Sequence, residues 1–399
     1  MLVILLTIAL SLGAEPAVVP AFKAHTVEPV PVSGTVQKLE SDGALHLSGP
    51  RVIAGADLVS VRQENEILPS PPAGPQVQFA GGDRMPGKLV AIKDGKALFR
   101  IQTTIDPLNR QADAEISIPL DAISVMWLVP PPERLSETVV KVLNERRRRD
   151  VVLMNNGDIR NGTIRECTTD GKLTLTEGTS DSSMPLSHVV ALAMNTDLAR
   201  TMRPSSRYYR LVLRNGARIS FASAAGDDQS LNGKLLTGAT VVIPWSQILS
   251  LETRQGAAAY LSDLKPKNYE HTPFFGLKWP YTRDRSVVGN DLRLAGHCYD
   301  KGLGMHSQSK ITFALDGKYR RFETLVGLDD RTGQGGSVRL HVLLDGQEKA
   351  AGDELTSVNG PRTLQFDCSG AKELTLVVEF GNGGDVRDHV NWAEARLIK

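Results

Sequence analysis

Residues 337–346 read SVRLHVLLDG, and an apolar side chain stands at every second position from Val338 to Leu344. Alternation with a period of two indicates a β-strand with one buried face, and the Asp345-Gly346 pair that follows is typical of a tight turn. The same pattern recurs on both sides of this stretch and predicts four more strands, over residues 310–315, 321–327, 363–367 and 374–379. We therefore expect the last third of the chain to form an antiparallel β-sandwich or jelly roll.

A repeat of similar texture runs from about residue 30 to residue 253. Each of its four copies combines apolar strands, Gly-containing turns and an apolar closing segment. Three copies close with proline, in the segments Ile118-Pro119-Leu120, Met184-Pro185-Leu186 and Ile243-Pro244-Trp245. The turn spacing resembles that of small barrels of the SH3 or Sm-like type. Because barrels of this size enclose no ligand, we expect the repeats to serve as a scaffold or to offer a surface to a protein partner.

These patterns predict a mainly β protein, with repeated small barrel-like units followed by the sandwich. The 36 glycines and 22 prolines suit many short strands joined by turns. The expected organisation is a signal peptide at 1–17, two degenerate β repeats at 30–128, a Pro-rich linker with a short helix at 129–150, two further repeats at 151–253, and the sandwich at 258–399.

Composition excludes several classes of function. The 46 Lys and Arg residues nearly balance the 45 Asp and Glu residues, so no global field attracts nucleic acid. The apolar run at residues 2–12 indicates an export signal and is too short to span a bilayer, so we expect a secreted, periplasmic or cell-surface protein without an integral membrane span. Cys167, Cys298 and Cys368 are too few for a disulfide framework; Cys298 and Cys368 either pair or stay buried thiols.

The C-terminal third also contains an ordered set of motifs. Residues 302–306 read GLGMH, 327–330 read GLDD, 335–338 read GGSV and 388–393 read DHVNWA. Together and in this order they resemble the NPCBM family, the carbohydrate-binding modules found attached to glycosyl hydrolases of family 98. The resemblance implies a galactose-binding-like jelly roll whose partner is a glycan or polysaccharide. This sequence departs from the family pattern at Asn391 and at Glu394, where Asp is usual.

A sugar presents hydroxyl groups and an apolar face of C–H groups, so a binding site combines polar side chains with an aromatic ring. The motifs supply both types, and the residues predicted to bind the glycan are His306, Asp329, Asp330, Asp388, Asn391 and Trp392. Each type of residue also has a structural alternative. Trp392 is equally suited to anchoring the last strand in the core, and His306 to bonding the backbone. Asp329 and Asp330 are equally suited to capping a turn before Gly333.

The resemblance further implies one structural calcium ion that ties the two ends of the sandwich together. Asp263, near the start of the domain, and Glu394, near its end, are the carboxylates predicted to hold it.

The function predicted from the sequence is that of an exported, non-catalytic protein whose C-terminal module binds galactose-type or related glycans. No phosphate-binding loop, metal-binding helix motif or nucleophile elbow occurs in the sequence. One alternative is an exported structural protein whose sandwich binds another protein. A second is a glycoside hydrolase accessory with its own activity, which would need two carboxylates across a cleft.

Overall fold

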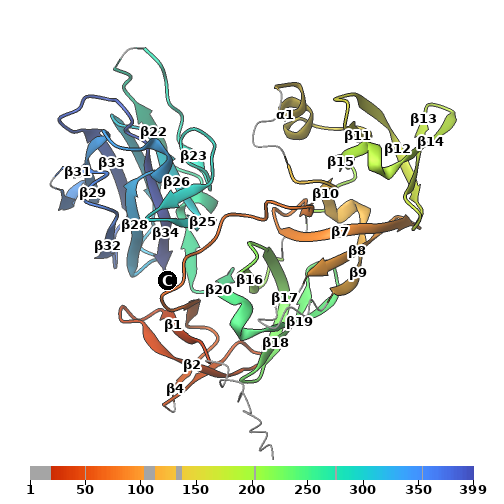
Figure 1. Cartoon of the computed structure of the whole chain (residues 1–399). Helices are drawn as coiled ribbons and strands as arrows, with labels where there is room; N and C mark the ends of the chain where they lie inside the picture. Colours follow the sequence, from red (N-terminus) through yellow and green to blue (C-terminus); the bar gives the residue numbers. More distant parts are fainter. Residues whose placement is uncertain are drawn as a thin grey trace, which may run out of the picture.

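The structure is a computed structural model that describes residues 19–49, 51–102, 113–131, 137–201, 204–274, 276–352 and 354–399. The predicted signal peptide, residues 1–17, lies outside the described residues. The chain is mainly β, as predicted. In the described residues, twenty strands form one hydrogen-bonded network in the N-terminal part of the chain. The C-terminal domain that follows is built mainly from two six-stranded sheets (Figure 1).

Each of the four N-terminal copies contains five strands. The first copy consists of β1 (Ala21–Thr26), β2 (Val32–Leu39), β3 (Leu45–Leu47), β4 (Arg51–Ile53) and β5 (Leu58–Gln63). The second consists of β6 (Gln76–Phe79), β7 (Arg84–Lys93), β8 (Lys96–Gln102), β9 (Asp113–Pro119), the 3-10 turn η1 (Leu120–Ala122) and β10 (Ile123–Trp127). The third consists of β11 (Asp150–Met154), β12 (Ile159–Cys167), β13 (Lys172–Glu177), β14 (Ser180–Pro185), η2 (Leu186–His188) and β15 (Val189–Ala193). The fourth consists of β16 (Tyr208–Leu213), β17 (Arg218–Gly226), β18 (Ser230–Leu235), β19 (Thr240–Pro244), η3 (Trp245–Gln247) and β20 (Ile248–Arg254).

In every copy the last strand pairs with the first, which curls the sheet on itself. The closing segment differs from the single apolar piece that the sequence pattern indicates. Pro119, Pro185 and Pro244 have φ angles of −58°, −66° and −58°, the range that the pyrrolidine ring fixes, and each leads into a 3-10 turn. The closing segment is therefore the end of one strand, a 3-10 turn and the start of the next strand.

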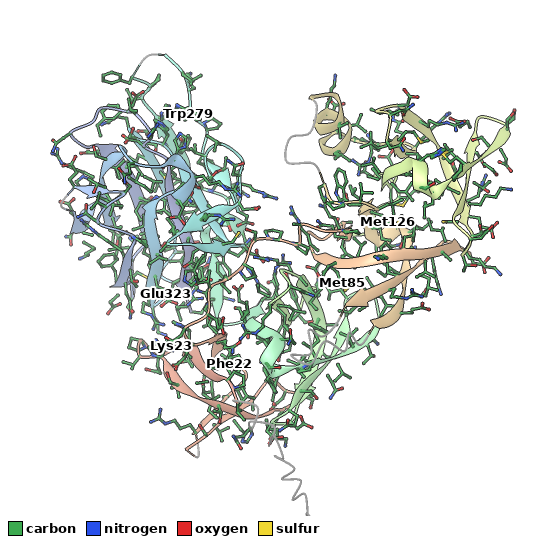
Figure 2. The ribbon with its side chains drawn as sticks, viewed as in Figure 1. Phe22, Lys23, Met85, Met126, Trp279 and Glu323 are labelled. Atoms are coloured by element: carbon green, nitrogen blue, oxygen red, sulfur yellow. The ribbon has the colours of Figure 1, made fainter. Side chains whose placement is uncertain are left out.

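Pairing between the copies follows the sequence order only in part. Strand β10 pairs with β15 and so joins the second copy to the third, whereas β5 pairs with β20 and joins the first to the fourth. In Figure 1 the red first copy accordingly lies beside the green fourth copy. One apolar core runs through all four copies, and Phe22, Met85 and Met126 are among its buried side chains (Figure 2). The ring of Trp245, in the fourth copy, meets Phe22 edge-on at 5.8 Å.

A short helix, α1 (Glu137–Asn144), connects the second copy to the third. The buried guanidinium of Arg147 donates from Nη1 to the backbone oxygens of Val142, at 3.1 Å, and Leu143, at 2.7 Å. These carbonyls belong to the last turn of the helix, where they have no partner within the helix. Arg147 therefore caps α1 at its C-terminal end.

The C-terminal domain is a sandwich. One sheet contains, in spatial order, β23 (Thr282–Arg283), β26 (Gly302–Met305), β34 (Val390–Ile398), β28 (Arg321–Leu328) and β32 (Arg362–Asp367), with β21 (Ala258–Tyr260) beside β34. The other contains β22 (Asn268–His271), β27 (Ser309–Ala314), β33 (Glu373–Phe380), β29 (Ser337–Leu344) and β30 (Gln347–Ala351), with β31 (Leu355–Thr356) beside β29. The remaining elements are η4 (Leu261–Asp263), η5 (Asp330–Thr332) and the hairpin β24 (Leu292–Leu294) to β25 (His297–Tyr299). The five strands expected from alternation are all present, with ends that agree within one residue.

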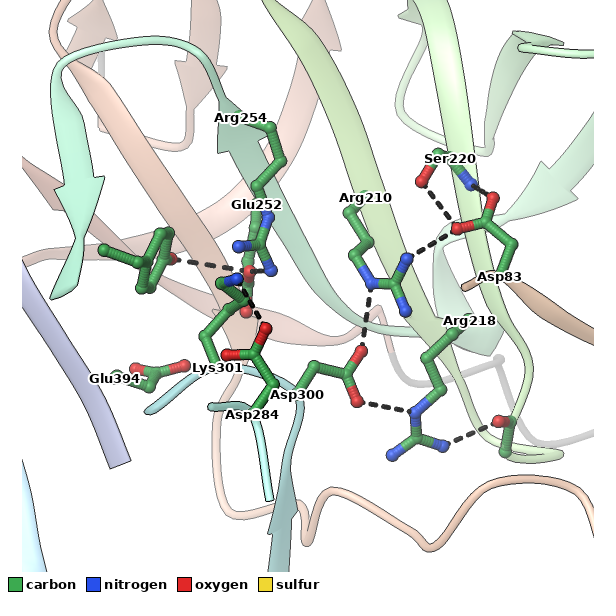
Figure 3. Close-up of polar contacts among 12 residues, drawn as sticks. Asp83, Arg210, Arg218, Ser220, Glu252, Arg254, Asp284, Asp300, Lys301 and Glu394 are labelled. Atoms are coloured by element: carbon green, nitrogen blue, oxygen red, sulfur yellow. Dashed lines mark hydrogen bonds and ion pairs between the residues drawn. The ribbon is translucent and has the colours of Figure 1, made fainter. Parts of the chain in front are cut away.

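The sandwich packs against the first and fourth copies through an apolar cluster and a chain of ion pairs. Leu68 and Leu249 of the repeats cluster with Leu292 of the sandwich. Beside this cluster, Asp300 of the sandwich accepts hydrogen bonds from Arg210 Nε at 3.0 Å and Arg218 Nε at 3.1 Å (Figure 3). Both arginines belong to the fourth copy, so the repeats and the sandwich are joined by buried polar as well as apolar contacts.

Candidate functional site

Four aromatic rings gather at one end of the sandwich. The indole of Trp279, in the loop between β22 and β23, is stacked on the imidazole of His306 with centroids 4.8 Å apart and an interplanar angle of 3°. His389 lies 5.6 Å from Trp279 and 5.5 Å from His306, and His271 lies 6.2 Å from His306. Figure 2 places Trp279 at the end of the sandwich opposite Glu323. We call these four residues the aromatic cluster.

The strand pairing explains why these rings meet. His306 follows β26 directly and His389 immediately precedes β34, and the two strands pair with Met305 opposite Val390. The Trp279 loop is fastened by its backbone. The N–H of Trp279 donates to His271 Nδ1 at 3.3 Å, and the carbonyl of Trp279 accepts from the Tyr269 hydroxyl at 2.6 Å. Trp279 is therefore held against the end of β22.

The histidines of the aromatic cluster are uncharged at neutral pH. Burial, together with the neighbouring His389, lowers the pKa of His306 to about 4. Burial also lowers the pKa of His271 and of His389. A neutral imidazole offers one N–H donor and one nitrogen acceptor, which suits hydrogen bonds with a hydroxyl group.

The surface around the cluster combines apolar area with a free carboxylate. Trp279 is only half-buried, and the same loop exposes Phe274 by 53% and Leu277 by 64%. The carboxylate of Asp385 lies close enough to act on the charge of His306. Within the described residues, no hydrogen bond or ion pair engages that carboxylate. An aromatic ring, neutral donors and a carboxylate acceptor thus face the same end of the domain.

Three of the residues predicted to bind sugar hold turns and strands together. Asp329 is buried and accepts from the backbone N of Arg331 and from Nδ2 of Asn391, both at 2.8 Å. Asn391 is also fully buried. Asp330 is exposed and accepts from the backbone N–H groups of Ala295 and Gly296, which fixes the turn between β24 and β25. These contacts fit the turn-capping alternative for the two aspartates, and contact of the three residues with a sugar stays a prediction.

Two further predicted residues, His306 and Asp388, are buried at the aromatic cluster. His306 is a member of the cluster; it is 4% exposed, and its imidazole stacks on the indole of Trp279. Asp388 has no exposed area, and its Oδ1 accepts from the backbone N of Ser337 at 3.0 Å. Burial raises the pKa of Asp388 to about 6. Direct contact of His306 or Asp388 with a sugar stays a prediction.

Trp392 lies in the core instead of on the surface. It is 0% exposed in the middle of β34, opposite Leu303 on one side and Val326 on the other. A ring without exposed area offers no face to a sugar, so the structure corrects its assignment as the sugar platform. Gly302 serves the same packing, because a Cβ there would stand 2.4 Å from the carbonyl oxygen of Trp392.

Comparison with known proteins agrees with this fold. Residues 257–398 match the family model described as NPCBM/NEW2 domain. The C-terminal domain is an NPCBM domain. The CBM51 module of Clostridium perfringens GH95, solved in complex with methyl-galactose, is 30% identical, with 35% of this chain and 99% of that chain covered and a TM-score of 0.33. The CBM51-2 and INT domains of Clostridium perfringens ZmpB, solved with GlcNAc, are 27% identical, with 44% and 37% covered and a TM-score of 0.33.

A curated relative covers a smaller segment. It is named "Putative endo-alpha-N-acetylgalactosaminidase", from Renibacterium salmoninarum, and is 27% identical over 110 residues. The match spans 28% of this chain and 7% of the relative. The similarity therefore concerns one part of a much longer protein.

Sequence reasoning missed three members of the aromatic cluster in the NPCBM domain. Trp279 stands between Gly276 and Pro280, outside any alternating pattern. An aromatic residue in a loop flanked by turn residues indicates a candidate binding residue, and this signal is present in the sequence. His389 lies inside the quoted DHVNWA motif, and His271 ends a strand. Nothing in the local pattern distinguishes these two histidines from structural ones.

Both predicted calcium ligands form ion pairs with cationic side chains. Asp263 accepts from Lys301 Nζ at 2.6 Å, and Glu394 pairs with Arg62 of the first copy. Calcium takes six to eight oxygen ligands, and adjacent cationic groups oppose its binding. Within the ranges that the structure describes, no three His, Cys, Asp or Glu side chains gather as a metal site. The residues present do not fit a calcium ion held by Asp263 and Glu394. Cys298 and Cys368 are separate buried thiols.

Proposed function

We propose that the NPCBM domain is a non-catalytic module that binds a galactose-type sugar on the exposed face of Trp279. The observation that supports it most is the stack of half-buried Trp279 on His306, a neutral ring pair at the end of the sandwich. An indole that stacks on His306, in a loop held by hydrogen bonds of the Trp279 backbone, keeps its orientation before a ligand arrives. Such a rigid ring loses little conformational freedom on binding.

The chemistry of galactose matches this surface. Its axial C4 hydroxyl leaves C–H groups together on one face of the ring, and an indole packs against such an apolar face. Hydroxyl groups at the edge of the sugar need donors and acceptors. The carboxylate of Asp385 is an acceptor, and the half-buried imidazole of His389 has a donor and an acceptor nitrogen.

The carboxylates near the cluster favour binding over hydrolysis. Glycoside hydrolysis uses two carboxyl groups on opposite sides of the bond, about 5 to 9.5 Å apart. Asp385 acts on the pKa of His306 and on that of Asp388, but Asp388 has no exposed area. A panel of chromogenic glycosides should therefore give no sustained turnover with the full chain.

The rest of the proposed function concerns the whole chain. The apolar run at residues 2–12 supports export. Among the described residues, no helix has the length and apolarity needed to cross a membrane. The four paired copies support a scaffold that presents the NPCBM domain, with their outer surface open to a protein partner.

Calorimetric titration of the full chain with methyl galactoside, methyl glucoside and N-acetylglucosamine tests the sugar-binding proposal. We expect saturable binding of the galactoside and weaker binding of the other two. Absence of binding to all three, and to an array of larger glycans, would contradict it and favour the protein-binding alternative.

A further inference from the structure

A cleft of about 810 Å³ lies where the second copy, the fourth copy and the NPCBM domain meet. Its walls include Asp83 and Arg84 from the second copy, Tyr208 from the fourth, and Asp284 and Tyr299 from the NPCBM domain. The volume falls in the range of about 300 to 1,000 Å³ that is usual for small-molecule sites. None of the four rings of the aromatic cluster lines it.

Positive charge predominates in this cleft. Nine Lys and Arg side chains line it against five Asp side chains, although the chain as a whole is balanced at 46 to 45. All five aspartates already have cationic partners. Asp83 and Asp300 pair with Arg210 and Arg218, which Figure 3 shows, while Asp263 and Asp284 pair with Lys301 and Asp291 with Arg285. Of the remaining cations, Arg254 pairs with Glu252 and Arg200 pairs with Asp121, two acidic residues outside the lining. Within the described residues, Arg84, Arg283 and Lys399 form no ion pair.

Arg84 is the clearest of these remaining cations. It is half-buried at the start of β7, and within the described residues no hydrogen bond or ion pair engages its guanidinium. Burial lowers its pKa, and the nearby charges of Arg285 and Arg218 act in the same direction. The charges of Asp291 and Asp300 act in the opposite direction. Arg283 also lines the cleft, and its guanidinium contacts the hydroxyl group and the ring of Tyr281. A guanidinium in this position has five N–H donors arranged to hold an oxyanion.

We propose that this cleft is a second ligand site, which binds the carboxylate or sulfate group of an acidic sugar through Arg84. The anionic charge of the ligand is inferred from the arginines of the cleft. The choice of a saccharide rests on the proposed function of the NPCBM domain, which supplies one wall. Tyr208, half-exposed in the wall, adds a ring and a hydroxyl group for the remainder of the sugar.

The two sites make separable predictions. The full chain is titrated with glucuronic acid, with a sulfated galactose and with inorganic sulfate, each at low and at raised salt. We expect both acidic sugars to bind, and their affinity to fall as salt rises because the contact is electrostatic. Arg84→Gln should weaken binding of the acidic sugars at least about tenfold, the loss expected for a hydrogen bond to a charged group. The same variant should leave binding of methyl galactoside unchanged.

Three controls make the result decisive. Arg51→Gln removes an exposed arginine that does not line the cleft and should change nothing. Arg84→Lys keeps the charge without the planar fork and should give an intermediate affinity, which shows that loss of folding is not the cause. Trp279→Ala should weaken galactoside binding about 30-fold and keep binding of glucuronic acid, so failure of the aromatic-cluster site and failure of the cleft are told apart.

Two outcomes would overturn the proposal. One is the absence of saturable binding of either acidic sugar to the wild-type chain. The other is binding that survives Arg84→Gln at full strength. Binding of inorganic sulfate without either sugar acid would also contradict the assignment to a saccharide.

Discussion

Replacing Trp392 with alanine should destabilise the NPCBM domain by about 3 to 5 kcal/mol. The side chain is 0% exposed and belongs to the core cluster that also holds Phe322 and Leu376. Truncation removes the buried indole and leaves a cavity in this core cluster, so the cost includes lost burial and lost packing. Natural domains are stable by only about 5 to 15 kcal/mol, so this single change removes a large part of the total.

Urea unfolding of the full chain, followed by intrinsic fluorescence and circular dichroism, measures this cost. Trp392→Phe is the matched comparison. Among the residues that the structure describes, the indole Nε1 has no hydrogen-bond partner, so phenylalanine leaves no acceptor unpaired and should cost less than alanine. Residual folded Trp392→Ala protein should still bind methyl galactoside. Wild-type stability combined with lost sugar binding would refute the reasoning, because it would place Trp392 in the site and not in the core.

Other changes test charge and packing. The pKa of Asp388 is raised to about 6, so the stability that its protonation confers is present below about pH 4 and lost as the pH rises through 6; Asp388→Asn should therefore melt above wild type at pH 7, with a difference that disappears by about pH 4. Asp300→Asn removes the charge shared by Arg210 and Arg218 and should cost about 3 to 5 kcal/mol in urea unfolding. Gly304→Ala should lower the melting temperature, because a Cβ there would stand 2.4 Å from the backbone N of Val287.

Alternation located the strands of the sandwich well because one face of each strand is buried. Strand β29 shows this clearly, since Val338, Leu340, Val342 and Leu344 are all buried. The repeats were harder to interpret. Their composition indicated strands and turns, but pairing of β5 with β20 joins residues about 190 positions apart, and no local pattern specifies such a partner.

The candidate site was predicted less completely than the fold. The motif residues form the framework of the domain, since Asp329 and Asn391 hydrogen-bond to each other and Trp392 fills the core. A recurrent motif marks packing as readily as binding, and sequence alone does not separate the two. Trp279 lies 27 residues before His306 in the chain, and only the folded loop stacks their rings.

The central claim is that Trp279 is the sugar platform, and its removal is the most direct test. Calorimetric titration with methyl galactoside should show Trp279→Ala weakened by about 2 kcal/mol, roughly 30-fold, as for other buried aromatic contacts. Lys278→Ala, which removes an exposed neighbour on the same loop, should bind like wild type. Equal affinity of Trp279→Ala and wild type, with both proteins folded, would contradict the assignment of the sugar to the aromatic cluster.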